Sequence, residues 1–101
     1  MALNHPTLEQ IRLPEVLTAL GHPVRLSIVR ALADGVERSC GSLPSPVSKS
    51  TMTHHWRVLR ESGVIYQRPS GREIFLTLRC ADLDEKFPGV LTAILATDAE
   101  D

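Results

Sequence analysis

The segment from residue 48 to residue 57 concentrates side chains that form hydrogen bonds with nucleic acids. Counted along a helix, one polar face carries Lys49, Ser50, Thr53, His54 and Arg57. Hydroxyl, ammonium, imidazole and guanidinium groups donate hydrogen bonds to phosphate oxygens and to the edges of bases. A helix face that is only solvated tends to be rich in Glu and Lys, so this composition favours contact with a polyanion.

Charge is unevenly distributed along the chain and supports the same interpretation. The formal net charge is −1, yet residues 22–80 contain nine arginines and lysines against four acidic residues. Residues 81–101 contain one lysine against six acidic residues. A basic centre in a nearly neutral protein predicts a local surface for a polyanion.

Length and composition restrict the class of protein. A chain of 101 residues with 43% apolar and 23% charged residues predicts one small globular domain. No apolar stretch approaches the roughly 18 residues that span a bilayer, and residues 1–10 lack the features of a secretory signal. We therefore expect a cytoplasmic protein with no membrane partner. The sequence also lacks a nucleophile elbow, a phosphate-binding glycine loop and a His-Glu-x-x-His motif, so we expect no enzyme.

Helical periodicity dominates the part of the chain before residue 63. Residues 13–20 and 23–33 predict two helices, and residues 39–43 predict one or two helical turns. The clearest helix covers residues 48–62, with Ser48 as its N-cap. Its apolar stripe, which we expect to face inward, consists of Met52, His55, Trp56 and Leu59.

Beyond residue 63 the pattern changes to the period of a β-strand. Residues 64–66 and 74–78 predict a hairpin, and its turn is flanked by Arg68 and Arg72. Residues 82–86 predict a loop or a helical turn, and a final helix is expected over residues 87–96. That helix carries more large apolar residues than a small core needs, which favours dimerisation.

This order of elements predicts a mainly α fold with a small β-hairpin, the winged helix-turn-helix. A helix such as residues 48–62 fits the major groove, where base edges present distinguishable patterns of donors and acceptors. A hairpin beside it reaches the flanking backbone or the minor groove, where arginines bind well.

Three ordered motifs resemble the ArsR/SmtB family of bacterial repressors. The run VSKSTMTHHWRVLRESGVI, residues 47–65, resembles the recognition helix of that family. LGHPVRLSIV at residues 20–29 resembles the stretch ahead of it, and RPSGR at residues 68–72 resembles the wing. The resemblance covers residues 13–80. It implies a homodimeric transcriptional regulator that binds a palindromic operator in double-stranded DNA.

The resemblance also implies roles for individual residues of this single domain, residues 1–101. The DNA-binding positions are Ser48, Lys49, Ser50, Thr51, Thr53, His54, Arg57, Arg68 and Arg72. The first and last helices would form the dimer, with residues 1–20 and 82–98 supplying these helices and an acidic tail. The interface residues would be Val16, Leu17, Phe87, Val90, Leu91, Ile94 and Leu95. We expect His55 and Trp56 to pack in the core rather than to contact DNA.

The best-known metal sites of the family are missing here. The Cys-x-Cys pair is replaced by Ser39-Cys40-Gly41, and residues 87–96 contain no His, Asp or Glu. One hypothesis combines His5 with the acidic tail of a partner chain, which would suit nickel, zinc or cobalt as an effector. A thiol switch between Cys40 and Cys80 is an alternative that requires the sulfurs to meet. Two further alternatives are a metal-independent regulator and a winged-helix interaction module without DNA binding.

Overall fold

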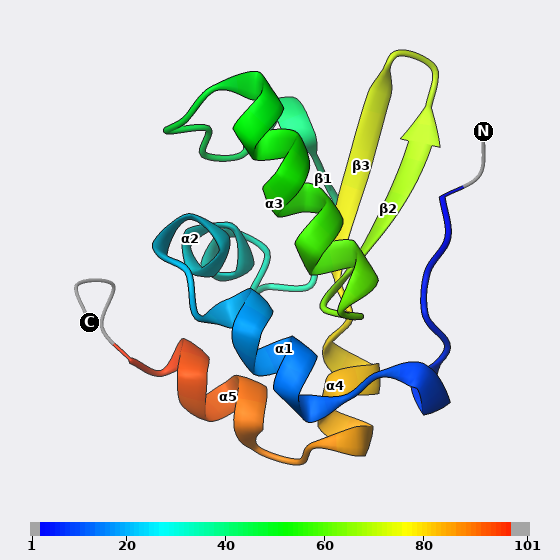
Figure 1. The fold of residues 1–101 in the computed structure, drawn as a ribbon, viewed down its shortest axis with the longest axis vertical. Helices are drawn as coiled ribbons and strands as arrows, with labels where there is room; N and C mark the ends of the chain where they lie inside the picture. Colours follow the sequence, from blue (N-terminus) through cyan, green and yellow to red (C-terminus); the bar gives the residue numbers. More distant parts are fainter. Residues whose placement is uncertain (1–2, 98–101) are drawn as a thin grey trace.

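The computed structural model describes residues 3–97 and arranges a group of helices beside a three-stranded antiparallel sheet (Figure 1). In chain order the elements are a 3-10 turn (Leu8–Gln10), α1 (Leu13–Leu20), α2 (Pro23–Ala31), β1 (Arg38–Ser39), a second 3-10 turn (Cys40–Ser42), α3 (Lys49–Glu61), β2 (Ile65–Ser70), β3 (Glu73–Leu78), α4 (Cys80–Lys86) and α5 (Val90–Leu95). The predicted winged helix-turn-helix is confirmed: α2 and α3 form the helix pair, and β2 and β3 form the wing.

Local sequence explains where the helices begin and end. Pro14 and Pro23 lie in the first turns of α1 and α2, where a missing N–H group breaks no helical hydrogen bond. The Ser48 hydroxyl caps α3 by accepting a hydrogen bond from the Thr51 N–H group at 3.3 Å. Gly63 reverses the chain after α3 with a φ of +89°, a conformation that L side chains rarely adopt. The three helices predicted before residue 63 are therefore present.

The sheet has the strand order β1-β3-β2. β1 contributes only two residues, which pair with Leu76 and Phe75 of β3, and so short a strand leaves no periodic signal in the sequence. The wing pairs from Ile65 opposite Leu78 to Ser70 opposite Glu73. The turn consists of Gly71 and Arg72 and is shorter than predicted, so Arg68 lies inside β2 and Arg72 lies in the turn rather than beside it.

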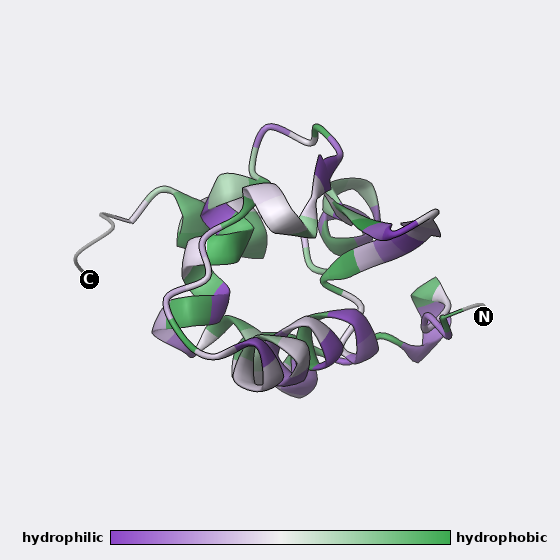
Figure 2. Ribbon diagram, turned by 90° about the horizontal axis from the view of Figure 1, so that it is seen from above, coloured by the Kyte–Doolittle hydropathy of each residue, from purple (hydrophilic) through white to green (hydrophobic). Residues whose placement is uncertain are grey.

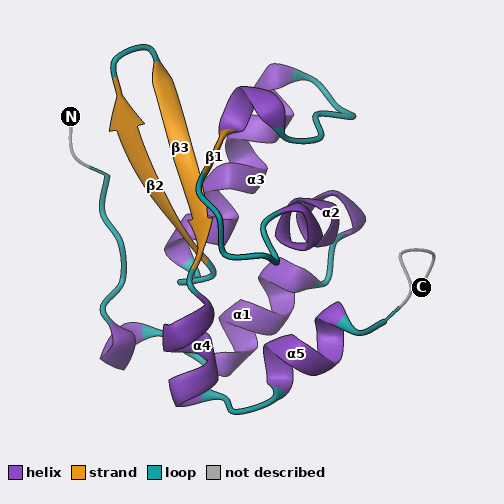
Figure 3. Cartoon of the chain, turned by 180° about the vertical axis from the view of Figure 1, so that it is seen from behind, coloured by secondary structure: helices purple, strands orange, loops and turns teal. Residues whose placement is uncertain are grey.

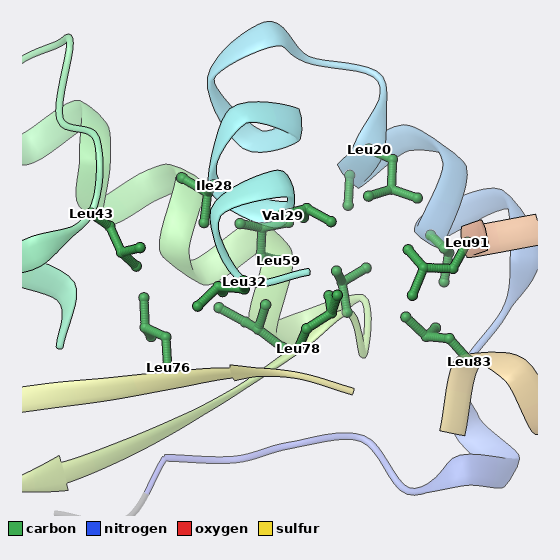
Figure 4. Close-up of a cluster of buried hydrophobic side chains, with 14 of the residues drawn as sticks. Leu20, Ile28, Val29, Leu32, Leu43, Leu59, Leu76, Leu78, Leu83 and Leu91 are labelled. Atoms are coloured by element: carbon green, nitrogen blue, oxygen red, sulfur yellow. The ribbon is translucent and has the colours of Figure 1, made fainter. Parts of the chain in front are cut away.

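One apolar core joins the helices to the sheet. Figure 4 shows leucine, isoleucine and valine side chains from α1, α2, α3, β3, α4 and α5 converging between these elements. Ile28, Leu32, Leu59 and Leu76 have no exposed surface. Hydrophobic and hydrophilic residues alternate along much of the helical ribbon (Figure 2), as in amphipathic helices on a single core, whereas α5 is almost entirely apolar. None of the helices in residues 3–97 is long and apolar enough to span a membrane.

The C-terminal part of the chain differs from the prediction. Instead of one helix over residues 87–96, two short helices, α4 and α5, are separated by Phe87, Pro88 and Gly89. Pro88 has no N–H group to continue α4, and Gly89 turns the chain with a φ of +83°. Helices α1, α4 and α5 gather at the end of the molecule opposite the hairpin tip (Figure 3). The tail acids Asp98, Glu100 and Asp101 lie outside the described residues.

Candidate nucleic-acid interface

Helix α3 divides into a buried stripe and an exposed polar face. Met52, His55 and Leu59 are at most 4% exposed, which confirms their inward orientation, and Trp56 is half-buried against the core. The side chains predicted to contact DNA on and before this helix are all exposed: Ser48, Lys49, Ser50, Thr51, Thr53, His54 and Arg57. The positive end of the helix dipole adds to this surface at its N-terminus.

The hydroxyl groups at the start of α3 are ordered by one another. Ser48 Oγ lies 2.9 Å from Thr51 Oγ1 and 3.3 Å from Ser50 Oγ. Thr53 donates a hydrogen bond to the Lys49 carbonyl oxygen at 3.0 Å. These short side chains do not project far from the helix, so a polyanion can approach the backbone closely.

The wing carries its two arginines in different environments. Arg72 lies in the turn after Ser70 and is exposed. Arg68 instead forms an ion pair with Glu37, at 2.7 Å between Nη2 and Oε1 and 3.0 Å between Nε and Oε2, and lies 5.0 Å above the Phe75 ring. The hydrogen bonds from Arg68 lower the pKa of the Glu37 carboxyl group. The Glu37 carboxylate therefore neutralises the positive charge of one of the two arginines of the wing.

Polar contacts anchor the hairpin base to the rest of the domain. Gln67, only 6% exposed, accepts a hydrogen bond from Arg60 of α3 at 2.7 Å through Oε1. The Arg79 guanidinium lies 4.2 Å above the Tyr66 ring and donates to Asp82 Oδ2 at 2.8 and 3.0 Å. These contacts fix the direction of the wing relative to α3.

His5 belongs to this anchor, and its predicted role as a metal ligand with the acidic tail stays a prediction, because the tail acids lie outside the described residues. Its Nε2 accepts a hydrogen bond from the Gln67 N–H group at 2.9 Å, and its ring also hydrogen-bonds to the Leu3 backbone. Burial and the nearby Arg60 and Arg79 lower the pKa of His5. No group of three His, Cys, Asp or Glu side chains within residues 3–97 could hold a metal ion. The lone pair that a metal would need is already used by the backbone of the wing.

The two cysteines lie toward opposite ends of β3 within one protomer and both are free, so the thiol switch stays a prediction. Ser39 pairs with Phe75, which places Cys40 beside the Ile74 end of β3. Cys80 begins α4, beyond the opposite end of that strand. At about 3.3 Å per residue the separation is roughly 15–20 Å, whereas a disulfide needs Cα atoms within about 7 Å.

Two of the predicted dimer residues lie in the core instead. Val16 is 2% exposed and Leu91 is 5% exposed, so neither offers surface to a partner. Both fall on the inward faces of their helices, where they pack in the common apolar cluster. Leu17, by contrast, is 47% exposed. Phe87, Val90, Ile94 and Leu95 are half-buried.

Known proteins share this arrangement. A family model described as a helix-turn-helix domain matches residues 20–68. The HTH-type transcriptional regulator YceK of Bacillus subtilis is 33% identical over 85% of this chain and 88% of its own length. The crystal structure of the transcriptional repressor BigR from Xylella fastidiosa has a TM-score of 0.61 and 31% identity, over 84% of this chain and 87% of that one. The chain belongs to the ArsR family of winged helix-turn-helix transcriptional regulators.

Two more relatives of this ArsR-family regulator agree with that assignment. A biofilm growth-associated repressor of Xylella fastidiosa is 32% identical over 84% of this chain and 75% of its own length. The crystal structure of a possible transcriptional regulator for arsenical resistance has a TM-score of 0.63 and 28% identity, over 86% of this chain and 88% of that one. The helix-turn-helix of this regulator is accordingly a DNA-binding element.

Sequence reasoning missed two charged residues that shape the interface of this ArsR-family regulator. Arg25 is 8% exposed, and it stands three and four residues before the buried Ile28 and Val29. That helical spacing is the signal that could have identified Arg25 as an inward position. Glu37 lies in a loop and meets Arg68 across 31 residues of sequence, so no local pattern could have identified the pair.

Proposed function

We propose that this regulator acts as a homodimer on a palindromic operator in double-stranded DNA, with α3 in the major groove and the wing beside the flanking backbone. The observation that supports the proposal most directly is that the polar start of α3 and the tip of the wing lie at the same end of the molecule (Figure 1). The polar face of α3 would read bases and phosphates, and Arg72 would bind phosphate or the minor groove.

The opposite end of the molecule supports the dimer. Leu13 and Leu17 of α1 are 36% and 47% exposed, and the half-buried Val90 and Ile94 lie on the neighbouring α5. Apolar surface on two adjacent helices favours a second copy, which would form a symmetric interface. In such a dimer, the polar α3 face of each protomer would stay free to contact one of two half-sites.

Repression is the mode that the relatives support, since the Xylella fastidiosa proteins are named as repressors. Nε2 of His5 already accepts a hydrogen bond from the Gln67 N–H group, which leaves that nitrogen no lone pair for a metal ion. We therefore propose a regulator whose DNA binding does not depend on a metal at His5.

Fluorescence anisotropy with DNA from the regulator's own upstream region tests the proposal, at one fixed salt concentration. We expect clear preference over scrambled DNA, and Arg57→Ala and Arg72→Ala should each weaken binding about tenfold while the protein stays folded. Arg12→Ala is the matched control, because Arg12 is an exposed arginine at the start of α1, away from the proposed DNA surface. Unchanged affinity in both wing and helix variants would refute this DNA surface.

A further inference from the structure

A buried hydrogen-bond cluster joins three helices behind the recognition face. Nη1 of Arg25 in α2 lies 3.1 Å from Nδ1 of His55 in α3. The same guanidinium donates from Nε to the Ala19 carbonyl oxygen at 2.7 Å and from Nη2 to the Thr18 carbonyl oxygen at 3.1 Å, both in α1. Arg25 and His55 are 8% and 4% exposed. One side chain from α2 therefore binds the last turn of α1 and the middle of α3 at once.

The chemistry of this contact determines the form of His55. A guanidinium can only donate hydrogen bonds, so Nδ1 of His55 must accept and must carry no proton. The ring is then neutral, with its proton on Nε2. Three groups that can carry positive charge face it: Arg25 from α2, the His22 ring at 4.6 Å from the loop before α2, and the His54 ring at 5.6 Å on α3 itself. α1 presents only its carbonyl oxygens to the cluster, through Arg25. Burial, followed by these three groups, lowers the pKa of His55.

We propose that Arg25 and His55 are positioning residues for DNA recognition. Through its hydrogen bond with Arg25, the neutral imidazole couples the orientation of α3 to the position of α1. This inference rests on the proposed function, in which α1 lies in the dimer interface and α3 contacts the operator. A rotation of α1 would move the Thr18 and Ala19 carbonyl groups, and the guanidinium that they hold would carry His55 and α3 with it. Packed hydrogen-bonded contacts of this kind transmit small displacements because their geometry is directional.

An alternative interpretation is that His55 only fills space in the core. Two substitutions distinguish space filling from the positioning of α3. His55→Asn places a neutral acceptor, Oδ1, near the position of Nδ1, and it fills less volume than histidine. His55→Leu fills the core well and is the better helix former, but it leaves Nη1 of Arg25 without an acceptor. Space filling predicts that the leucine variant performs better, whereas positioning predicts the asparagine variant.

Three measurements on the full chain decide between them. Nitrogen-15 NMR of the histidine rings at about pH 8 should show His55 neutral with Nδ1 unprotonated, and the ring should stay neutral to lower pH than in the denatured protein. Operator affinity should be at least about tenfold weaker in His55→Leu and within about threefold of wild type in His55→Asn. Amide hydrogen exchange along α3 should be faster in the leucine variant than in the asparagine variant.

Each opposite result overturns the inference. A proton on Nδ1 would remove the Arg25–His55 hydrogen bond on which the inference rests. Equal operator affinities of the two variants, or a higher affinity of His55→Leu, would show that packing alone matters. If His55→Asn does not fold, as judged by circular dichroism, His55→Gln supplies a neutral amide in its place. If wild type shows no preference for its operator, the proposed function fails, while the ring NMR and the amide exchange still decide whether Arg25 and His55 position α3.

Discussion

Arg68 binds both carboxylate oxygens of Glu37, with distances of 2.7 Å from Nη2 to Oε1 and 3.0 Å from Nε to Oε2. The two residues lie 31 positions apart in the sequence, one in the loop before β1 and one in β2. Both side chains are partly exposed, so a phosphate group can compete with Glu37 for the guanidinium. We therefore expect the acid to oppose DNA binding at the wing.

Replacement of Glu37 should strengthen DNA binding. In Glu37→Gln, Arg68 no longer has to break an ion pair before it can bind phosphate. We therefore expect a several-fold gain in affinity for operator and scrambled DNA alike. The slope of log affinity against log salt should steepen by about 0.9, the value for one additional phosphate contact. Asp34→Asn is the matched control, because it removes the same charge from an exposed arginine pair with Arg38. An equal gain in both variants would show that only net charge matters.

Substitution of Gly63 should destabilise the domain. An alanine there would adopt an unfavourable φ of +89°, and its Cβ would lie 2.5 Å from Cγ1 of the buried Ile11. We expect Gly63→Ala to lower the unfolding free energy by about 2–4 kcal/mol, measured by urea denaturation. Gly35→Ala has a similar φ of +78° with no atom within 4 Å, so it isolates the backbone cost and should lose less. Equal losses would contradict a steric role for Ile11.

A charge on the outer face of α1 should separate the protomers. Leu17 is 47% exposed, and burial of an unpaired carboxylate in the proposed interface is costly. Sedimentation velocity should therefore show a dimer for wild type and a monomer for Leu17→Asp, with operator affinity reduced in parallel. Val36→Asp introduces the same charge at a residue that is 53% exposed in the loop before β1, and it should stay dimeric. A dimeric Leu17→Asp variant would place the interface elsewhere.

The unfolding free energy should fall as the pH is lowered. The pKa values of His5 and His55 are lowered in the folded protein, so below about pH 6.5 the unfolded chain binds protons that the folded chain does not. Stability from these groups is complete above that pH and is lost as the pH falls toward the folded pKa values. His5→Gln keeps an acceptor for the Gln67 N–H group and should flatten the profile measured by urea denaturation between about pH 7.5 and pH 5.

The control for that profile is Lys49→Gln, because Lys49 is exposed on α3 and is not among the groups that shift the pKa of His5 or His55, so the slope should stay as in wild type. A wild-type profile that is flat over this range, or an unchanged slope in His5→Gln, would contradict the lowered pKa of His5.

Sequence by itself determined the elements that local chemistry controls. Pro14 and Pro23 at helix starts, Ser48 as a cap and Gly63 as a stop act within a few residues, so α1, α2 and α3 could be predicted with little error. The period of the apolar residues likewise showed which face of α3 is buried and which carries its polar groups. That was enough to predict the fold class and the exposed polar side chains of α3.

Tertiary structure alone decided which distant groups meet. The pairing of Arg68 with Glu37 and of Arg25 with His55, and the use of His5 by the wing, depend on how the elements pack and leave no periodic trace in the chain. The same holds for Val16 and Leu91: an apolar residue on an amphipathic helix suits a core or an interface equally well, and only the neighbouring helices settle which. Hydrophobicity specifies burial, whereas contact partners follow from the three-dimensional arrangement.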